Sequence, residues 1–295
     1  MQNITREGFL YGLAAYVWWG LVPIYFYWLQ SDRPLDFVAH RIVWSMIFLA
    51  ILVTALGRWP ETIRTLTTPR LIAPLGLSAV LVAGNWLIYV LCVYNQVIIQ
   101  ASLGYFILPL VNVVLGLMLF RERLRPLQVA AIGIAVLGVL VLALAVGEVP
   151  WLSFGLAFSF SIYGLIRKQV PVDGLVGLTV ETIVLAPFMF AYLVHGYAAS
   201  VEMEEPALLF KLAVSGVVTA VPLLCFGQAA RRLPFTVLGL MQYLAPSLQF
   251  ALAILLFNES ARDWPGFVFV WAALAIFSID SYRWYRARDA EPESA

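Results

Sequence analysis

A few polar and ionisable residues of this 295-residue chain lie inside long apolar runs, and they are the candidates for its chemistry. His40 and Arg41 share one run, Asn85 lies in the next, and Glu181 lies much further along. In a hydrocarbon environment a charged side chain costs several kcal/mol, with about 3 kcal/mol at the low end. Each such residue therefore needs a partner, water or a functional role, and by default it marks a pathway for substrate or ions.

The first group predicts a positively charged layer near the outer side of the membrane. His40 and Arg41 lie about 8–9 Å below the outer edge, if their run crosses inward with the rise of a helix. Asn85, on a run that crosses outward, lies about 9 Å from the same edge. These groups would attract an anionic group of a substrate. Trp44, one turn from Arg41, is placed to stack on the guanidinium or simply to pack.

The alternative for this layer is structural. Arg41 would then extend to the outer lipid headgroups, and His40 would bond to backbone carbonyls. A basic residue here runs against the usual preference for the inner side, which favours a functional role.

Glu181 is the acidic counterpart, about 10 Å above the inner edge of the membrane. Burial in hydrocarbon favours the neutral form of a carboxyl group, so Glu181 is the candidate for proton coupling. The alternative is a structural carboxyl group hydrogen-bonded to a neighbouring helix, and Tyr163, Gln242 and Tyr243 reach a similar depth. The vertical gap between Glu181 and Arg41 is roughly 11 Å, too long for an ion pair.

The other candidates for substrate contact are aromatic and amide side chains within the apolar runs. They are Trp86, Tyr89, Tyr105, Asn112, Tyr163, Gln242 and Tyr243. For Asn112 an interhelical contact is the favoured role.

Ten apolar runs, each about as long as a bilayer is thick, must position these side chains. Hydrophobic residues make up 62% of the chain and charged residues 12%, which leaves almost nothing for a soluble domain. The fold class predicted is an all-α integral membrane protein with ten transmembrane helices. The runs are residues 8–30, 35–57, 71–93, 101–120, 127–146, 151–166, 174–195, 207–230, 236–257 and 264–282. Cys92 and Cys225 fall inside them and are expected to pack as small apolar residues.

The basic residues predict the orientation of the chain. With a cytoplasmic N-terminus and ten crossings, fourteen of the 18 basic residues fall in cytoplasmic segments. Only Arg33, Lys211 and Arg262 fall in outer segments, whereas Arg41 lies within a run. Because basic residues in short loops stay inside, both termini should be cytoplasmic.

Two parts of the chain look like copies of each other. Pairing Pro109 with Pro246 also pairs Phe120 with Phe257, Glu122 with Glu259 and Arg125 with Arg262, without a gap. Ten helices divide into two sets of five, and an odd number places the second set upside down in the membrane. The prediction is a first repeat over residues 1–147, an inverted second repeat over 148–285, and a short cytoplasmic tail over 286–295. Inverted repeats are characteristic of secondary transporters.

Five stretches of the chain form a recognisable set: His-Arg-Ile-Val-Trp-Ser (40–45), Gly-Asn-Trp-Leu-Ile-Tyr (84–89), Ala-Ser-Leu-Gly-Tyr-Phe (101–106), Tyr-Gly-Leu-Ile-Arg-Lys (163–168) and Gln-Tyr-Leu-Ala-Pro (242–246). Together they resemble the signature of RarD-type permeases, in the EamA branch of the drug/metabolite transporter superfamily. The resemblance implies ten helices, two EamA repeats, a central substrate cavity, the bacterial cytoplasmic (inner) membrane, export, and a link to chloramphenicol resistance. Gln100 and Leu108 depart from the pattern, where many relatives have Glu and Asn.

The resulting functional hypothesis is a secondary transporter that moves a small organic metabolite or drug by alternating access. Its expected partners are the small-molecule substrate, membrane lipids and a coupling proton, with no cofactor, no nucleic acid and no ATP. The chain has no phosphate-binding loop, and its two lysines are Lys168 and Lys211. His40 and His195 have no metal-ligand spacing. The alternatives are an intramembrane enzyme acting on a lipid-linked substrate, which needs paired catalytic groups at one depth, and a channel.

Overall fold

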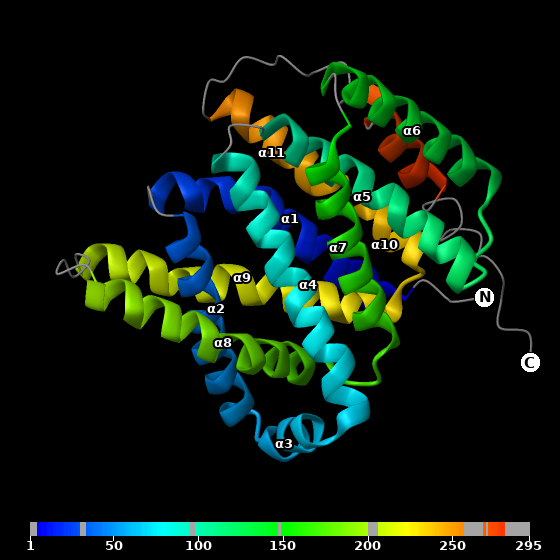
Figure 1. The fold of residues 1–295 in the computed structure, drawn as a ribbon. Coiled ribbons are helices and arrows are strands. Elements are labelled where there is room, and N and C mark those ends of the chain that lie inside the picture. The colour runs from blue at the N-terminus through cyan, green and yellow to red at the C-terminus, as the bar shows by residue number, and fades with distance from the viewer. Residues whose placement is uncertain are drawn as a thin grey trace, which may run out of the picture.

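The computed structural model describes residues 5–29, 34–94, 98–146, 149–199, 206–256, 268–269 and 271–280, and within these it contains helices and no strand (Figure 1). Eight helical segments of the described part are long and apolar enough to cross a membrane. They are α1 (Arg6–Leu29), α2 (Pro34–Ala55), α4 (Pro69–Tyr94), α5 (Ile98–Leu119), α6 (Pro126–Val146), α8 (Gly174–Ala199), α9 (Pro206–Arg232), and the pair α10 (Phe235–Met241) and α11 (Leu244–Leu255) counted as one.

The two remaining predicted spans are helical but do not meet these criteria. The sixth predicted span is α7 (Trp151–Gln169), which is long enough but carries more polar residues. Of the tenth, the structure describes the helix Trp271–Asp280, and the rest lies outside the described residues. A membrane protein with many helical spans is therefore confirmed, whereas the number ten stays a prediction.

Helix α3 (Trp59–Thr67) was not predicted, because its residues were assigned to a loop between two spans. It begins next to Pro60, a residue suited to the first turn of a helix. Thr62 and Thr65 are buried against the bundle, while Ile63 is exposed. The helix is short and amphipathic, so a search for apolar runs alone passes over it.

The ninth predicted span is broken between α10 and α11, and Pro246 explains the break. Proline has no N–H for the carbonyl of Gln242, four residues earlier. The N–H of Ala245 bonds to that carbonyl instead, at 3.2 Å, and the N–H of Gln242 turns back to Gly239, at 3.0 Å. The carbonyl of Leu238 accepts a bond from the hydroxyl of Tyr16, at 3.1 Å. Helix α1 thus supports the break.

Helix α7 lies inside the bundle, in contact with α4, α5 and α9, whereas α6 lies at the edge and packs against α5 (Figure 1). A second set of contacts joins α2 to α8 and α9, and α1 to α9 and α11. The centre holds a cluster of aromatic rings from α1, α7 and α9, with ring centroids 5.2–6.5 Å apart: Tyr16, Trp19, Phe160, Tyr163 and Phe226. Helices that carry the candidate polar residues therefore meet around α7 and α9.

Helices α2 and α9 approach each other closely at Gly216. The hydroxyl of Ser45 donates to the carbonyl of Gly216 at 3.1 Å. A Cβ atom on Gly216 would lie 2.4 Å from the carbonyl carbon of Trp44, a distance that requires the backbone to move. A glycine is needed here because the two backbones touch.

Gly216→Ala is expected to destabilise the protein by about 1–3 kcal/mol, since the added methyl group overpacks a backbone contact. The measurement is the thermal midpoint of the purified protein in detergent. Gly133→Ala on α6 is the matched control, because no atom lies within 4 Å of the added Cβ. Equal midpoints for the two variants would show that α2 and α9 do not approach as described.

Candidate functional site

Glu181 is the centre of a buried polar cluster that joins α4, α7 and α8. Its side chain is 1% exposed. The carboxylate oxygen Oε1 accepts a bond from the hydroxyl of Ser78 at 2.5 Å and lies 3.3 Å from Nη1 of Arg167. The hydroxyl of Tyr163 lies near this carboxylate, but neither this hydroxyl nor Oε2 of Glu181 has a hydrogen-bond partner among the described residues. Neighbouring helices therefore provide two partners for Glu181, Ser78 and Arg167, and the second is a cation.

Arg167 was not among the predicted site residues, because it was counted with the basic residues of an inner segment. Its side chain is only 2% exposed. The short connection between α7 and α8 turns the chain back, so that residues fourteen apart in sequence face each other. Arg167 lies in the last turn of α7, and an arginine so close to a predicted span end was the available signal.

The guanidinium of Arg167 occupies a slot bounded by glycines. A Cβ atom on Gly177 of α8 would lie 1.9 Å from Nη1, and one on Gly227 of α9 would lie 3.1 Å from Nη2. The carbonyl of Gly174 accepts a bond from Nη2 at 3.1 Å. Any larger residue at Gly177 would displace the guanidinium, so this glycine makes the ion pair with Glu181 possible.

Arg41 is the centre of a second cluster, formed by α2, α4 and α9. Its Nε donates to the hydroxyl of Thr219 at 3.0 Å. The guanidinium carbon lies 4.1 Å from the centroid of the Trp86 ring and 5.5 Å from that of Phe37. No carboxylate of the described residues lies within ion-pair distance of Arg41. The side chain is half-buried and makes these contacts with protein groups.

The rings over the guanidinium of Arg41 belong to Trp86 on α4 and Phe37 on α2. Trp44, for which stacking on Arg41 and simple packing were both considered, is not one of them. Tyr89 and Tyr105, two predicted site residues, lie with ring centroids 6.2 Å apart. The structure thus places aromatic rings from α2 and α4 against this cation.

A small cavity lies between the two clusters, enclosed by α2, α4, α8 and α9. Trp86 and Thr219, both partners of Arg41, form part of its wall, and so do Leu178 and Thr182, which flank Glu181 on α8. The space for the centre of a water-sized sphere is about 10 Å³, which is the room of about one water molecule. In this conformation the helices therefore leave no room for an organic substrate in this cavity.

The amide side chains have interhelical partners. Asn85 donates to the carbonyl of Leu156 at 2.8 Å and to the hydroxyl of Ser159 at 2.9 Å, so it faces α7 and not Arg41. Asn112 of α5 donates to Gln242 at 2.5 Å, an interhelical contact of the kind predicted.

The break between α10 and α11 is held against α5 by a second contact, in which the hydroxyl of Tyr243 donates to the carbonyl of Phe106 at 3.1 Å. Gln242 and Tyr243 therefore contact α5, and of the three side chains considered as partners of Glu181 only Tyr163 lies near its carboxylate. His40 is buried on α2, beside Arg41.

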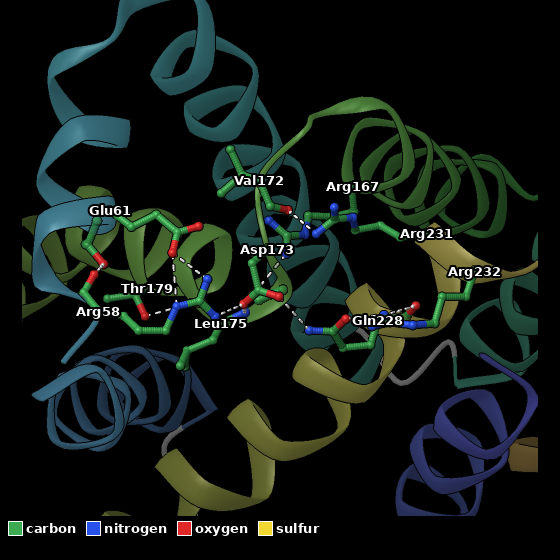
Figure 2. A network of polar contacts seen from close by, with 12 residues as sticks. Arg58, Glu61, Arg167, Val172, Asp173, Leu175, Thr179, Gln228, Arg231 and Arg232 are labelled. Atoms are coloured by element: carbon green, nitrogen blue, oxygen red, sulfur yellow. Dashed lines mark hydrogen bonds and ion pairs between the residues drawn. The ribbon is translucent and has the colours of Figure 1, made fainter. Parts of the chain in front are cut away.

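An ion-pair network closes the end of the bundle beyond Glu181 (Figure 2). Asp173, between α7 and α8, accepts bonds from Arg58 at 2.7 Å, from the side chain of Gln228 at 3.0 Å and from the N–H of Leu175 at 3.0 Å. Burial would raise the pKa of Asp173, but these hydrogen bonds and the charge of Arg58 outweigh it and lower that pKa. The network joins the start of α3, the turn before α8 and the end of α9.

Glu122, which the sequence pairs with Glu259, caps a helix of the other half of the chain. Its two carboxylate oxygens accept the N–H groups of Phe235 at 2.7 Å and Thr236 at 2.9 Å, at the start of α10. A carboxylate is favourable there because the first N–H groups of a helix lack partners. Glu259 lies outside the described residues.

Ionisable side chains held within a bundle of membrane-spanning helices, as Arg41 and Glu181 are here, commonly mark the pathways of membrane transporters. The sequence matches the EamA-like transporter family over residues 6–144. It is 44% identical to Protein RarD of Salmonella typhi over 285 residues, which cover 94% of this chain and 96% of the relative. It is 43% identical to an uncharacterized transporter of Pseudomonas aeruginosa, over 94% of this chain and 95% of that one.

A solved crystal structure shares the fold, with a TM-score of 0.73 and 17% sequence identity, over 93% of this chain and 98% of the other. The curated relatives are similar along nearly their whole length, and the class is that of multi-pass membrane transporters. The chain belongs to the EamA-like transporter family, among its RarD-type permeases.

Proposed function

We propose that this protein is a secondary transporter that exports a small organic metabolite or drug across the bacterial cytoplasmic membrane by alternating access. The observation that carries the proposal is the closed cavity between the Arg41 and Glu181 clusters. Its walls come from α2 and α4 of the first half of the chain and from α8 and α9 of the second. Relative movement of the two halves would open it to one side or the other.

The arrangement of the two halves as inverted five-helix repeats has support in the helix boundaries. Helix α5 begins at Ile98 and α10 begins at Phe235, an offset equal to that between Pro109 and Pro246. The family match over residues 6–144 nearly coincides with the proposed first repeat, residues 1–147. The proposal therefore keeps ten spans, a second repeat over 148–285 and a tail over 286–295.

The orientation is tested by reporter fusions. A reporter after Ala295 is expected to be active in the cytoplasm, and one inserted at Glu204 is expected to be external, because basic residues concentrate in the segments assigned inside. The measurement is the activity of a paired cytoplasmic and periplasmic reporter at each site. A periplasmic signal after Ala295 would contradict both the topology and the inverted repeats.

Glu181 is proposed as the proton-coupling group, with Arg167 as its counter-charge. The carboxylate is buried, and its oxygen Oε1 contacts both the guanidinium of Arg167 and the hydroxyl of Ser78. Protonation would remove the charge that holds Arg167 and would weaken the link between α7 and α8. Such a pair gives a bound proton a direct effect on helix packing.

The proposed transport is tested by comparing the metabolites inside and outside cells with and without the gene. An exporter is expected to shift at least one organic compound from the cell to the medium. The same compound is then followed in vesicles that contain the purified protein. Saturable uptake that responds to a proton gradient supports a coupled carrier, whereas unsaturable flux would indicate a channel and chemical conversion an enzyme.

A further inference from the structure

We propose that the transported compound is an organic monocarboxylate and that Arg41, within its aromatic surroundings, binds its carboxylate. This inference rests on the proposed transport function and names the chemical class of its substrate. Two arginines, Arg41 and Arg167, lie within the bundle, and they differ in their partners.

The charge of Arg167 is compensated within the protein, and that of Arg41 is not. Arg167 lies 3.3 Å from the Glu181 carboxylate and is fixed in place by surrounding glycines. Arg41 has a neutral partner, the hydroxyl of Thr219, and the faces of Trp86 and Phe37. Among the described residues no carboxylate lies within 4 Å of it. A cation within membrane-spanning helices whose charge is not compensated by the protein favours the binding of an anion.

Two nitrogen donors of the Arg41 guanidinium are available to bind a carboxylate. The hydroxyl of Thr219 accepts the hydrogen bond from Nε–H, and the ring of Trp86 covers one face of the guanidinium. The two terminal nitrogens, Nη1 and Nη2, have no hydrogen-bond partner among the described residues. They form a planar pair of donors, whose spacing fits the two oxygens of one carboxylate.

Charge balance selects a monocarboxylate over a phosphate. One guanidinium compensates one negative charge. A phosphate monoester carries up to about two negative charges at neutral pH, so one of them would remain uncompensated in a low-dielectric space. The rings against the guanidinium of Arg41 are those of Trp86 and Phe37. Such rings favour a flat apolar body attached to the carboxylate.

The cavity that would receive this body is closed in the present conformation. Trp86 and Thr219 contact Arg41 and also line the cavity, so its opening and the position of the guanidinium are linked. A carboxylate that occupies the opened space between α2, α4 and α9 would be within reach of Arg41.

The test is a binding assay on the purified full-length protein in detergent. The probes are matched sets of a carboxylate, its neutral amide and the corresponding phosphate monoester, on aromatic and aliphatic bodies, 3-phenylpropionate and its amide among them. Binding is followed by thermal stabilisation and by tryptophan fluorescence. Carboxylates with an aromatic body are expected to bind about tenfold or more tightly than their amides, the equivalent of a charged hydrogen bond.

Variants of Arg41 identify the site. Arg41→Ala is expected to abolish the preference for the carboxylate, and Arg41→Lys to weaken it, since an ammonium lacks the planar fork. If Arg41→Ala does not fold, Arg41→Gln keeps a donor for Thr219 and tests the charge alone. Lys211→Ala is the matched control, because Lys211 is also a cation over a tryptophan ring but is bound to the carbonyl of Trp28.

Two outcomes overturn the inference. One is equal binding of carboxylates and amides, or no binding of any carboxylate in the sets. The other is an unchanged carboxylate preference in folded Arg41→Gln protein. Gene-dependent export of a neutral compound would overturn the substrate class while leaving the transport function intact, whereas absence of any gene-dependent export would contradict the transport function itself.

Discussion

Replacing Arg167 by glutamine is expected to destabilise the folded protein by about 3–5 kcal/mol, because the change leaves the carboxylate of Glu181 buried without its cation. Ser78 still donates a hydrogen bond to this carboxylate, but a hydroxyl group does not balance its charge. The free energy of unfolding is measured by denaturation with sodium dodecyl sulfate in mixed micelles. The loss is expected to be largest at neutral and alkaline pH and smaller in acid, where protonation of Glu181 removes the unpaired charge.

The double variant Arg167→Gln/Glu181→Gln provides the decisive comparison. Both charges are then absent, and two amides can bond to each other and to Ser78, so most of the lost stability should return. Arg231→Gln is the matched control. Arg231 is an exposed cation at the same end of the bundle that donates to the carbonyl of Val172, and its loss should cost less than about 1 kcal/mol. A double variant no more stable than Arg167→Gln alone would show that the two charges are not coupled.

Transmembrane helices were predictable because a bilayer imposes a length and an apolar composition on each one. The boundaries of α1, α6 and α9 differ from the predicted runs by a few residues at most. Depth along a helix was also informative, since it assigned Arg41 and Glu181 to separate layers, and the structure gives each its own set of partners.

Partners across helices were not predictable, because they depend on how each helix is rotated about its axis. Spacing along α2 placed Trp44 near Arg41, but the ring that covers the guanidinium is Trp86 of α4. Asn85, beside Trp86 in sequence, faces α7 instead. No property of a single helix determines such rotations, and apolar faces that look alike in sequence give no preference.

Two prolines at matching positions of the sequence also show that contacts between helices were not predictable from the sequence. Pro109 and Pro246 align in the two halves, and a bend was possible at either one. Pro109 lies inside a continuous α5, whereas Pro246 is preceded by a break of the chain into α10 and α11. The difference lies in the neighbours, because Tyr16 and Asn112 provide hydrogen bonds to the residues around the break. A proline permits a break, and the partners available nearby decide whether one forms.

The network around Asp173 connects these observations to alternating access. It joins Arg58, at the start of α3, to Gln228, near the end of α9, and so fastens the first half of the chain to the second. Asp173 is one residue from Gly174, whose carbonyl accepts a bond from Arg167. The Glu181 cluster and this network are thus contiguous, and in the proposed mechanism a change of charge at Glu181 would act on the contacts at this end of the bundle.

The second large effect is expected for Glu181→Gln, in transport rather than in stability. The glutamine side chain has nearly the shape of a protonated glutamate, and its oxygen still accepts bonds from Ser78 and Arg167. Arg167 also keeps the carbonyl of Gly174 as a partner. The variant should therefore fold, with a smaller loss of stability than Arg167→Gln. It should still bind substrate, but it has no carboxyl group to protonate.

Vesicles with purified protein and an imposed proton gradient measure this effect on the compound identified by the metabolite comparison. Wild-type protein is expected to accumulate the compound against its gradient at a rate that depends on pH. Glu181→Gln should lose both the uphill accumulation and the pH dependence, while exchange of the compound across the membrane continues. Ser78→Ala is the control, since it removes one bond to the carboxylate and leaves the titrating group in place. A folded Glu181→Gln protein that still accumulates the compound, with an unchanged pH dependence, would remove Glu181 from the coupling mechanism and leave the pair with Arg167 a structural role.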